Sequence, residues 1–291
     1  MTTTEILRNV RKIEIKTRGV VNQIFSGEYH SVFKGRGMNF SEVREYQYGD
    51  DIRSIDWNVS ARYNHPYIKV YEEERELTVV LIVDFSRSGN FGTVEKFKNE
   101  IAAELCAVLA FSALKNNDKV GMILFTDIIE KFIPPKKGKS HALRLIRELL
   151  AFQPKNHGTN ISLALENLTH VMKRRCIAFV ISDFFDDGFE KALQLASKKH
   201  DVIALQLFDP KEQDIPKIGL VKFRDAETGI DRWVDTSSNT VREMFARYFQ
   251  QLREHQKQMF LKSRVDAVPI RIDQSYVNPL VNFFRMREGR A

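Results

Sequence analysis

LTVVLIVDFSRSG, residues 77–89, is the stretch that decides the fold. Its first seven residues contain one polar side chain, Thr78, and this run is too short to cross a membrane but suits one buried strand. A strand that is apolar throughout is typical of a parallel sheet covered by helices on both faces. The run ends at Asp84, and Ser86 and Ser88 follow at alternate positions. Three oxygen-bearing side chains therefore stand where a buried strand opens into a loop, which is where ligands bind in open α/β sheets.

Apolar strand-like segments alternate with amphipathic ones along the rest of the chain, which predicts a doubly wound, mostly parallel, Rossmann-like α/β sheet. Long amphipathic periods predict helices between the strands. A short edge strand at 128–133, closed by Pro134 and Pro135, and a hairpin of 220–223 with 230–234 complete the pattern. Strands are predicted at 77–84, 119–125, 176–182, 201–208 and 267–272. Helices are predicted at 93–114, 140–152, 158–172, 238–262 and 278–286, and another follows Asp187 and runs to about residue 197.

Residues 1–75 differ from this alternation, so the sequence predicts two parts, 1–75 and 76–291. Residues 4–25 have apolar positions spaced by three and four, as in an amphipathic helix. Residues 33–57 mix aromatics, glycines and charges of both signs without a clean period. Disordered tails lack so many aromatics, so we expect this segment to be folded, with its Arg and Asp/Glu side chains paired.

The composition indicates a globular protein with enough apolar material for a full core, since 43% of residues are hydrophobic and 29% are charged. The N-terminus lacks the apolar segment of a signal peptide, and no run approaches the length of a membrane helix. We therefore expect a cytoplasmic protein without a transmembrane segment. Cys106 and Cys176 are expected to be buried thiols rather than a disulfide or a metal pair.

Positive charge is concentrated in residues 131–155, where Glu148 is the one acid among seven Lys and Arg side chains. Such a patch could bind a nucleic acid or an acidic partner. A solvated helix face with its preceding loop is the favoured interpretation, and no nucleic-acid-binding motif accompanies the patch. No specific nucleic-acid partner is therefore expected.

Candidate site residues follow several predicted elements that share one edge of the sheet. Taken singly, the hydroxyl residues could cap helices or form turns, and Asp183 could form an Asx turn. Together they bring two carboxylates to one partly desolvated edge, where each raises the pKa of the other. Arg87 would point away from the serines of an extended segment, so a divalent cation fits better. Carboxylates and hydroxyls without His or Cys favour Mg²⁺ or Mn²⁺, and the candidate ligands are Asp84, Ser86, Ser88, Thr159 and Asp183.

Two parts of the sequence resemble known protein families. Asp84-x-Ser86-x-Ser88, with Gly158-Thr159 and Ser182-Asp183 later in the chain, resembles the metal-ion-dependent adhesion site of von Willebrand factor A domains. The segment FSEVREYQYGDDIRSIDW at residues 40–57 resembles the bacterial proteins with "domain of unknown function 58". Together the resemblances cover roughly residues 20–285.

The resemblance implies a von Willebrand factor A-like domain that holds one Mg²⁺ or Mn²⁺. In such domains the serines and the threonine ligate the metal directly or through water, and the aspartates act largely through water. Similar proteins are often encoded beside a MoxR-type AAA+ ATPase. The resemblance therefore implies an adaptor that works with such an ATPase in maturing or remodelling other proteins.

The expected function is a non-enzymatic, metal-dependent protein-interaction module, with an Asp or Glu of a protein partner completing the metal's coordination. The alternative is a Mg²⁺-dependent hydrolase or phosphoryl-transfer enzyme that uses an aspartate as nucleophile or base. The sequence contains no Walker-type phosphate loop and no plausible Ser-His-Asp set. His157, two residues before Thr159, is the one candidate base, and a loop histidine without catalytic role explains it more simply.

Overall fold

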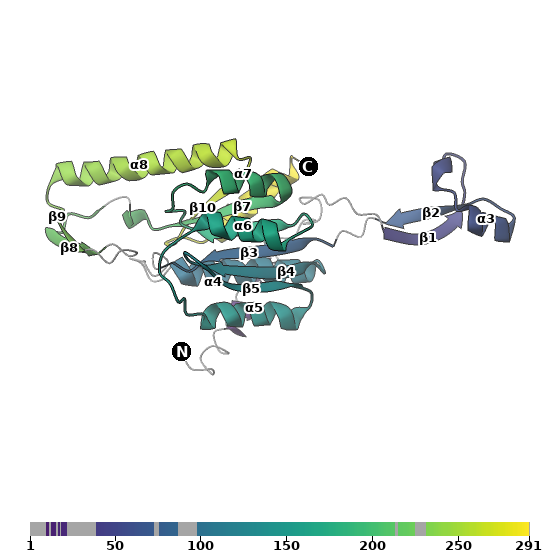
Figure 1. Ribbon diagram of the computed structural model, residues 1–291, viewed down its shortest axis with the longest axis horizontal. Helices are drawn as coiled ribbons and strands as arrows, with labels where there is room; N and C mark the ends of the chain where they lie inside the picture. Colours follow the sequence, from purple (N-terminus) through teal and green to yellow (C-terminus); the bar gives the residue numbers. More distant parts are fainter. Residues whose placement is uncertain are drawn as a thin grey trace. The chain divides into compact units, whose positions relative to one another are not determined.

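A computed structural model describes residues 10–11, 13–15, 17, 19–21, 39–72, 76–86, 98–212, 215–224 and 231–290 (Figure 1). Its contacts divide the chain into two compact units, one formed by Met1–Val32 with Leu77–Ala291 and the other by Phe33–Glu76. The described residues between 10 and 21 are helical, and Glu14 pairs with Lys139 of the larger unit, with 3.0 Å between Oε1 and Nζ. The contacts thus group this helix with the larger unit, whereas the prediction grouped it with the segment that follows it.

The larger unit is built on a six-stranded sheet whose strands pair in parallel except at one edge. Their order across the sheet is β10-β7-β6-β3-β4-β5, and β5 pairs antiparallel with β4. Starting from β3, the chain adds β4 and then β5 on one side of it, and afterwards adds β6, β7 and β10 in turn on the other side. This order confirms the predicted doubly wound, mostly parallel class and places its switch point between β3 and β6. The strands are β3 (Thr78–Asp84), β4 (Lys119–Phe125), β5 (Ile129–Lys136), β6 (Ile177–Ser182), β7 (Asp201–Phe208) and β10 (Asp266–Arg271).

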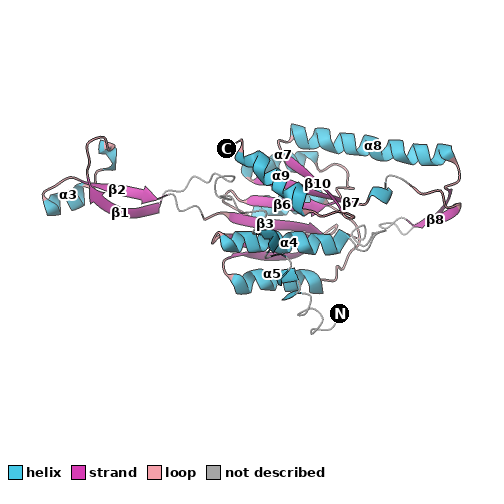
Figure 2. Ribbon diagram, turned by 180° about the vertical axis from the view of Figure 1, so that it is seen from behind, coloured by secondary structure: helices cyan, strands magenta, loops and turns pink. Residues whose placement is uncertain are grey.

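Helices cover both faces of this sheet, as Figures 1 and 2 show from opposite sides. On β3, Val80 and Ile82 belong to an apolar cluster formed with α6, α7 and α8, while Val79, Leu81 and Val83 alternate with them toward the other face. All five of these side chains are fully buried, and burial of each stabilises the fold by roughly 1.5–3 kcal/mol. The helices are α4 (Lys98–Lys115), α5 (Lys139–Ala151), α6 (Ile161–Val171), α7 (Glu190–Lys199), α8 (Asn239–Lys262) and α9 (Val277–Glu288).

The edge strand β5 runs further than predicted. It continues through Pro134 and Pro135 to Lys136 instead of ending before them. Proline lacks a backbone N–H and is tolerated in a sheet at an edge, where the missing donor faces no further strand. Gly121 on β4 lies directly against this segment, and a Cβ there would come within 2.8 Å of Pro135 Cγ. The prolines therefore pack on β4 rather than closing the strand.

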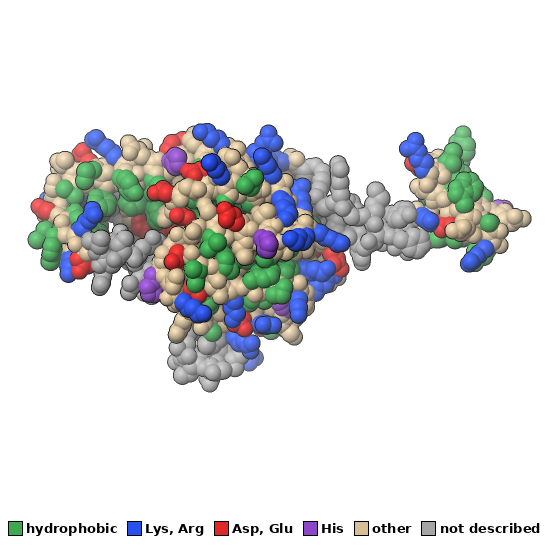
Figure 3. Space-filling model, in the orientation of Figure 1, with side chains coloured by type: hydrophobic (Ala, Val, Ile, Leu, Met, Phe, Trp, Pro, Cys, Tyr) green, Lys and Arg blue, Asp and Glu red, His purple; other side chains and the backbone are tan. Residues whose placement is uncertain are grey.

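The predicted hairpin is present as β8 (Leu220–Arg224) and β9 (Asp231–Asp235), which pair antiparallel. A series of aromatic rings connects it to α8 and onward to the sheet: Phe223 stacks near Phe245, Phe245 near Phe249, and Phe249 meets Phe185. Hydrophobic side chains stay at the surface around the hairpin and the first half of α8 (Figure 3). The exposed ones include Leu220, Trp233, Met244 and Tyr248.

The smaller unit is a two-stranded sheet with short helical segments between its strands. Its β1 (Asn39–Glu45) and β2 (Tyr67–Glu72) pair antiparallel, with η1 (Ile52–Ser54) and α3 (Trp57–Tyr63) between them. The alternation of polar and apolar residues at 67–71 predicts β2, whereas residues 39–45 lie in the segment without a clean period and β1 is not predicted. Arg44 forms a double hydrogen bond with Asp50 at 2.8 Å, and Lys69 lies 3.4 Å from Asp56, which caps α3. These Arg–acid and Lys–acid pairs agree with the expected pairing of charges in this segment.

No helix among the described residues is long and apolar enough to cross a membrane.

Candidate metal centre

Asp84 ends β3 at the switch point of the sheet and is buried there. Its Oδ1 accepts a hydrogen bond of 2.8 Å from the backbone N of Ser86, and its Oδ2 accepts one of 2.6 Å from Ser182 Oγ at the end of β6. Ser86 is itself buried. The hydrogen bond from Ser182 ties the ends of β3 and β6 together, so the carboxylate is fixed between the two strands.

Asp183 follows Ser182 and brings a second buried carboxylate to the same edge. Its Oδ1 accepts a 3.3 Å hydrogen bond from the backbone N of Phe185, which makes the Asx turn that local sequence suggests. Its Oδ2 lies 2.9 Å from the ammonium of Lys98, at the start of α4. The turn and the ion pair together orient Asp183 toward α4.

Phe184 holds this loop in an unusual backbone conformation, with a φ of 59° in the left-handed region. A non-glycine residue at such an angle is kept there by its surroundings. The backbone N donates to Ser182 Oγ at 3.0 Å, and the carbonyl accepts from the buried Gln256 Nε2 of α8 at 2.7 Å. The ring is buried against Phe260. The backbone beside Asp183 is thus held from both β6 and α8.

Thr159 lies in the loop that leads into α6, directly before two residues that are bonded to the segments after β4 and β6, the strands on either side of β3. Asn160 N donates to the carbonyl of Thr126, which follows β4, and Ile161 N donates to Asp186 Oδ2, beyond β6. Since β3 lies between β4 and β6, this loop crosses the sheet edge at the end of β3. Asn160, rather than Thr159, caps α6, accepting a hydrogen bond from Leu163 N. The half-buried Thr159 therefore does not serve as the helix cap.

Ser88, the remaining candidate ligand, lies outside the described residues. The same is true of Arg87, the cation that was considered in place of a metal. The structure brings Asp84, Ser86 and Asp183 to one sheet edge and places Thr159 in the loop that crosses this edge. Asp186 accepts a 2.7 Å hydrogen bond from the backbone N of Ile161, the first residue of α6.

Electrostatics distinguish the two aspartates. Burial, and then the charge of Asp183, raise the pKa of Asp84 to about 7, although hydrogen bonds from Ser182 and Ser86 act in the opposite direction. Asp84 accepts its hydrogen bonds from neutral donors, the backbone N–H of Ser86 and the hydroxyl of Ser182, whereas Asp183 has the ammonium of Lys98. Burial disfavours the charged form of Lys98, but Asp183 and Glu212 outweigh it and raise the lysine's pKa. Within the described part of the chain, Asp183 therefore has a cation at hydrogen-bond distance, whereas the donors to Asp84 are a backbone N–H and a hydroxyl.

The donor chemistry of the site fits a hard divalent cation. Two carboxylates and hydroxyls are oxygen ligands, which suit Mg²⁺ or Mn²⁺, and such ions accept waters in their remaining positions. Within the described ranges, no group of three or more His, Cys, Asp and Glu side chains could hold a metal ion. A metal here would depend on the serine and threonine hydroxyls as well as on the aspartates.

Other candidates from the sequence are not part of this edge. His157 is exposed in the loop before α6. Cys106 and Cys176 are both buried free thiols, as expected. In the basic segment 131–155, Glu148 lies 2.6 Å from Lys131 and within 4.0 Å of Arg147, so its one acid is shared among the basic side chains.

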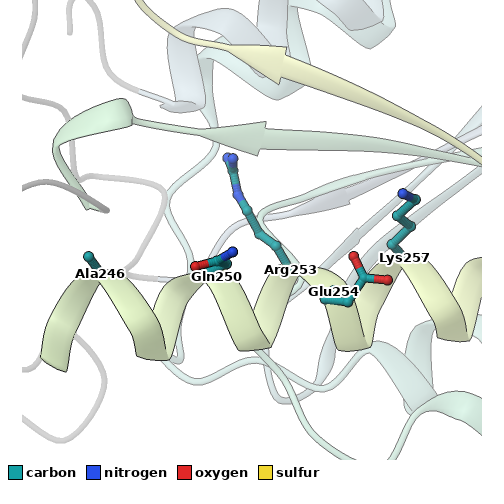
Figure 4. A pocket seen from close by; sticks show the side chains of 5 residues that line it. All are labelled: Ala246, Gln250, Arg253, Glu254 and Lys257. Carbon is teal, nitrogen blue, oxygen red and sulfur yellow. The ribbon is translucent and has the colours of Figure 1, made fainter. Parts of the chain in front are cut away.

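A pocket of about 370 Å³ lies along α8 and is separate from the aspartates (Figure 4). Arg253 extends from the helix toward β7, and its guanidinium lies 3.9 Å from the centre of the Phe208 ring. The negative charge of Glu212 also acts on Arg253. The lining side chains are Ala246, Gln250, Arg253, Glu254 and Lys257.

Sequence reasoning missed Lys98 and Glu212 as neighbours of the site. Lys98 stands just before the apolar run 101–111 of α4, and a lysine so close to a buried helix segment was the available signal. Glu212 lies in η3 (Pro210–Glu212), after β7, and nothing in its local sequence marks it. Both become neighbours of Asp183 only through the arrangement of strands.

Comparisons with known proteins give this chain a family. Residues 42–257 match the family described as "Protein of unknown function DUF58". The uncharacterized protein Mb1516 of Mycobacterium bovis is 26% identical over 285 residues, which cover 97% of this chain and 90% of that protein.

Two of the solved structures to which this chain is similar come from Bacteroides species. An aerotolerance-related membrane protein from Bacteroides fragilis is 18% identical, with a TM-score of 0.50 over 74% of this chain and 100% of that one. The conserved hypothetical protein BatB from Bacteroides thetaiotaomicron is 20% identical, with a TM-score of 0.49 over the same shares. The chain belongs to the DUF58 family, and its larger unit has the doubly wound, mostly parallel fold that the sequence predicts.

Proposed function

We propose that this protein is a metal-dependent protein-interaction module without enzymatic activity. The observation that carries the proposal is Asp84, a buried carboxylate at the switch point that accepts hydrogen bonds from two neutral donors, a backbone N–H and a hydroxyl. A divalent cation would offset its charge, with Ser86, Ser88 and Thr159 as further ligands and Asp183 acting through water. Mg²⁺ or Mn²⁺ bound there would offer a positively charged coordination position to another molecule.

The partner in this proposal is a protein that places an Asp or Glu carboxylate on the metal. Charge-assisted contacts of this kind are strong and directional. The resemblance to von Willebrand factor A domains supports this mode of binding. By the same resemblance, we propose that the protein works as an adaptor with a MoxR-type AAA+ ATPase in the maturation or remodelling of other proteins.

Titration calorimetry with Mg²⁺ and Mn²⁺ tests the metal site directly. The wild-type chain is expected to bind one ion, and Asp84→Asn is expected to abolish binding, because the amide removes the charge while keeping the size of the side chain. Asp127→Asn is the matched control, since Asp127 follows the neighbouring strand β4 and is exposed. Equal affinity in wild type and Asp84→Asn would rule out the proposed site.

A pull-down from host lysate with and without EDTA tests the interaction. Capture of a protein partner by the metal-loaded chain, lost with EDTA and with Asp84→Asn, is the expected outcome. Turnover of a phosphoester panel that is lost in the same variant would replace this function with Mg²⁺-dependent hydrolysis or phosphoryl transfer.

A further inference from the structure

Lys98 is a buried cation placed between two acids at the edge of the sheet. Its Nζ lies 2.9 Å from Asp183 Oδ2 and 2.6 Å from Glu212 Oε1. The lysine side chain is 2% exposed, that of Asp183 3% and that of Glu212 12%. A buried ion pair with such short distances persists because removing either partner would leave an uncompensated charge in a poorly solvated place.

Three elements of the sheet edge fix this ammonium. Lys98 begins α4, Asp183 follows β6, and Glu212 belongs to η3 after β7. Glu212 is held in turn, because its Oε2 accepts a 3.1 Å hydrogen bond from the backbone N of Asp209. The ring of Phe185 lies below the ammonium, with 5.4 Å from its centre to Nζ. Lys98 is thus a fixed part of the site and not a surface lysine that swings in solvent.

The ammonium of Lys98 gives Asp183 and Asp84 different electrostatic surroundings. Asp183 already has a full positive charge at hydrogen-bond distance, while Asp84 has hydrogen bonds from a backbone N–H and a hydroxyl. A divalent ion that approaches this edge finds Asp84 available and must compete with Lys98 for Asp183. It also meets repulsion from the ammonium, which lowers the affinity of the site for the ion.

We propose that Lys98 is a positioning residue that keeps Asp183 out of direct metal coordination, so that the ion keeps a position open for an incoming carboxylate. The proposal rests on the proposed metal site and adds the residue that sets its charge. A metal bound by one charged ligand retains net positive charge and attracts an acidic group. A metal bound by two carboxylates would be held more tightly but would attract that group less.

The test uses Mn²⁺ alone as the probe, with the full chain and the variant Lys98→Met. Methionine keeps much of the length of the lysine and removes its charge. Mn²⁺ affinity measured by calorimetry is expected to rise at least tenfold. The water-proton relaxation enhancement caused by the bound Mn²⁺ is expected to fall, because Asp183 replaces a water on the ion. A purely structural role for Lys98 predicts the opposite change, a loss of affinity.

Two further variants make the result specific. The double variant Lys98→Met with Glu212→Gln removes one charge of each sign, so Glu212 is not left as a carboxylate without its ammonium. This variant should also bind Mn²⁺ more tightly than the wild type. Lys115→Met removes a charge from the exposed other end of α4, and its Mn²⁺ affinity should equal that of the wild type. If Lys98→Met is unfolded without metal by circular dichroism, Mn²⁺ is expected to restore its fold.

The outcomes separate this inference from the function on which it rests. Wild-type Mn²⁺ binding with equal or weaker binding by the folded Lys98 variants would overturn the role of Lys98 and leave the metal site standing. Unfolded Lys98 variants that Mn²⁺ fails to restore would overturn it as well. Absence of Mn²⁺ binding by the wild type and by every variant would overturn the proposed metal site and this inference together.

Discussion

His200 shows how burial, more than any other effect, sets the charge of a single residue. It ends α7 and is 1% exposed, and its Nδ1 lies 3.3 Å from Cys176 Sγ and 3.4 Å from Cys176 N. Its Nε2 has no hydrogen-bond partner among the described residues. Burial lowers the pKa of His200 from 6.5 to about 4, and the charges of Lys199 and Arg175 act in the same direction. The folded state therefore holds this imidazole neutral where an unfolded chain would protonate it.

The lowered pKa of His200 predicts that the protein loses stability in acid. As the pH falls below 6.5, the unfolded chain takes up the proton first, so the free energy of unfolding decreases until the pH reaches about 4. At pH 4.5 the wild type is expected to have lost roughly 2–3 kcal/mol through this group. Urea denaturation at pH 7 and 4.5 measures the loss.

The variant His200→Asn isolates the effect, because its amide oxygen can accept the hydrogen bond from Cys176 N but does not titrate. Its acid-induced loss should be smaller than that of the wild type by roughly the same 2–3 kcal/mol. His170→Asn changes an exposed histidine and should behave as the wild type does. An identical loss in wild type and His200→Asn would contradict the prediction.

At the scale of elements, the pairing of β4 with β5 depends on a glycine. The register of the two strands shifts between Val120 and Met122, and Gly121 lies at that irregularity. A Cβ on Gly121 would come within 2.8 Å of Pro135 Cγ and 2.9 Å of the carbonyl oxygen of Ile133. A backbone oxygen cannot rotate away as a flexible side chain can, so the edge strand would have to move.

Gly121→Ala is therefore expected to reduce the free energy of unfolding by about 1–3 kcal/mol, the usual cost of overpacking. Urea denaturation at neutral pH measures the change. Gly289→Ala provides the control, because a Cβ there would lie 3.8 Å from the nearest atom, an ordinary contact, and should change stability by less than about 0.5 kcal/mol. Equal stability of Gly121→Ala and the wild type would show that β5 adapts without cost.

For the whole molecule, metal binding and folding are linked if the ion needs the assembled sheet edge. Asp84 and Asp183 are 99 positions apart and meet only when β3 and β6 pair, so an unfolded chain offers no such site. Mg²⁺ or Mn²⁺ at 100 times its dissociation constant is expected to stabilise the fold by about 2.7 kcal/mol. For a chain of this size, that raises Tm by several degrees.

Thermal unfolding with and without Mn²⁺ measures this linkage. Asp84→Asn should show no Mn²⁺-dependent shift, and Asp127→Asn should shift as the wild type does. A shift of equal size in Asp84→Asn would mean that the ion acts elsewhere on the folded chain.

The sequence could predict most strands and helices of the larger unit because each carries its own period. The apolar runs at 119–125 and 201–208 coincide with β4 and β7 at both ends. Prediction failed where local signals were absent or misleading. The strand β1 has no clean alternation, and Pro134 and Pro135 suggested an end to β5 that the edge position does not require.

By itself, the sequence determined the fold class and the kind of ligand atoms at the sheet edge, because apolar runs fix buried strands and Asp, Ser and Thr supply oxygen ligands. The tertiary structure alone decided which charges meet there. Lys98 and Glu212 are 114 positions apart, and Lys98 meets both Asp183 and Glu212 only because the start of α4, the end of β6 and η3 lie at the same edge of the sheet. Electrostatic energy depends on distances of a few ångströms across the fold, and sequence spacing does not encode those distances.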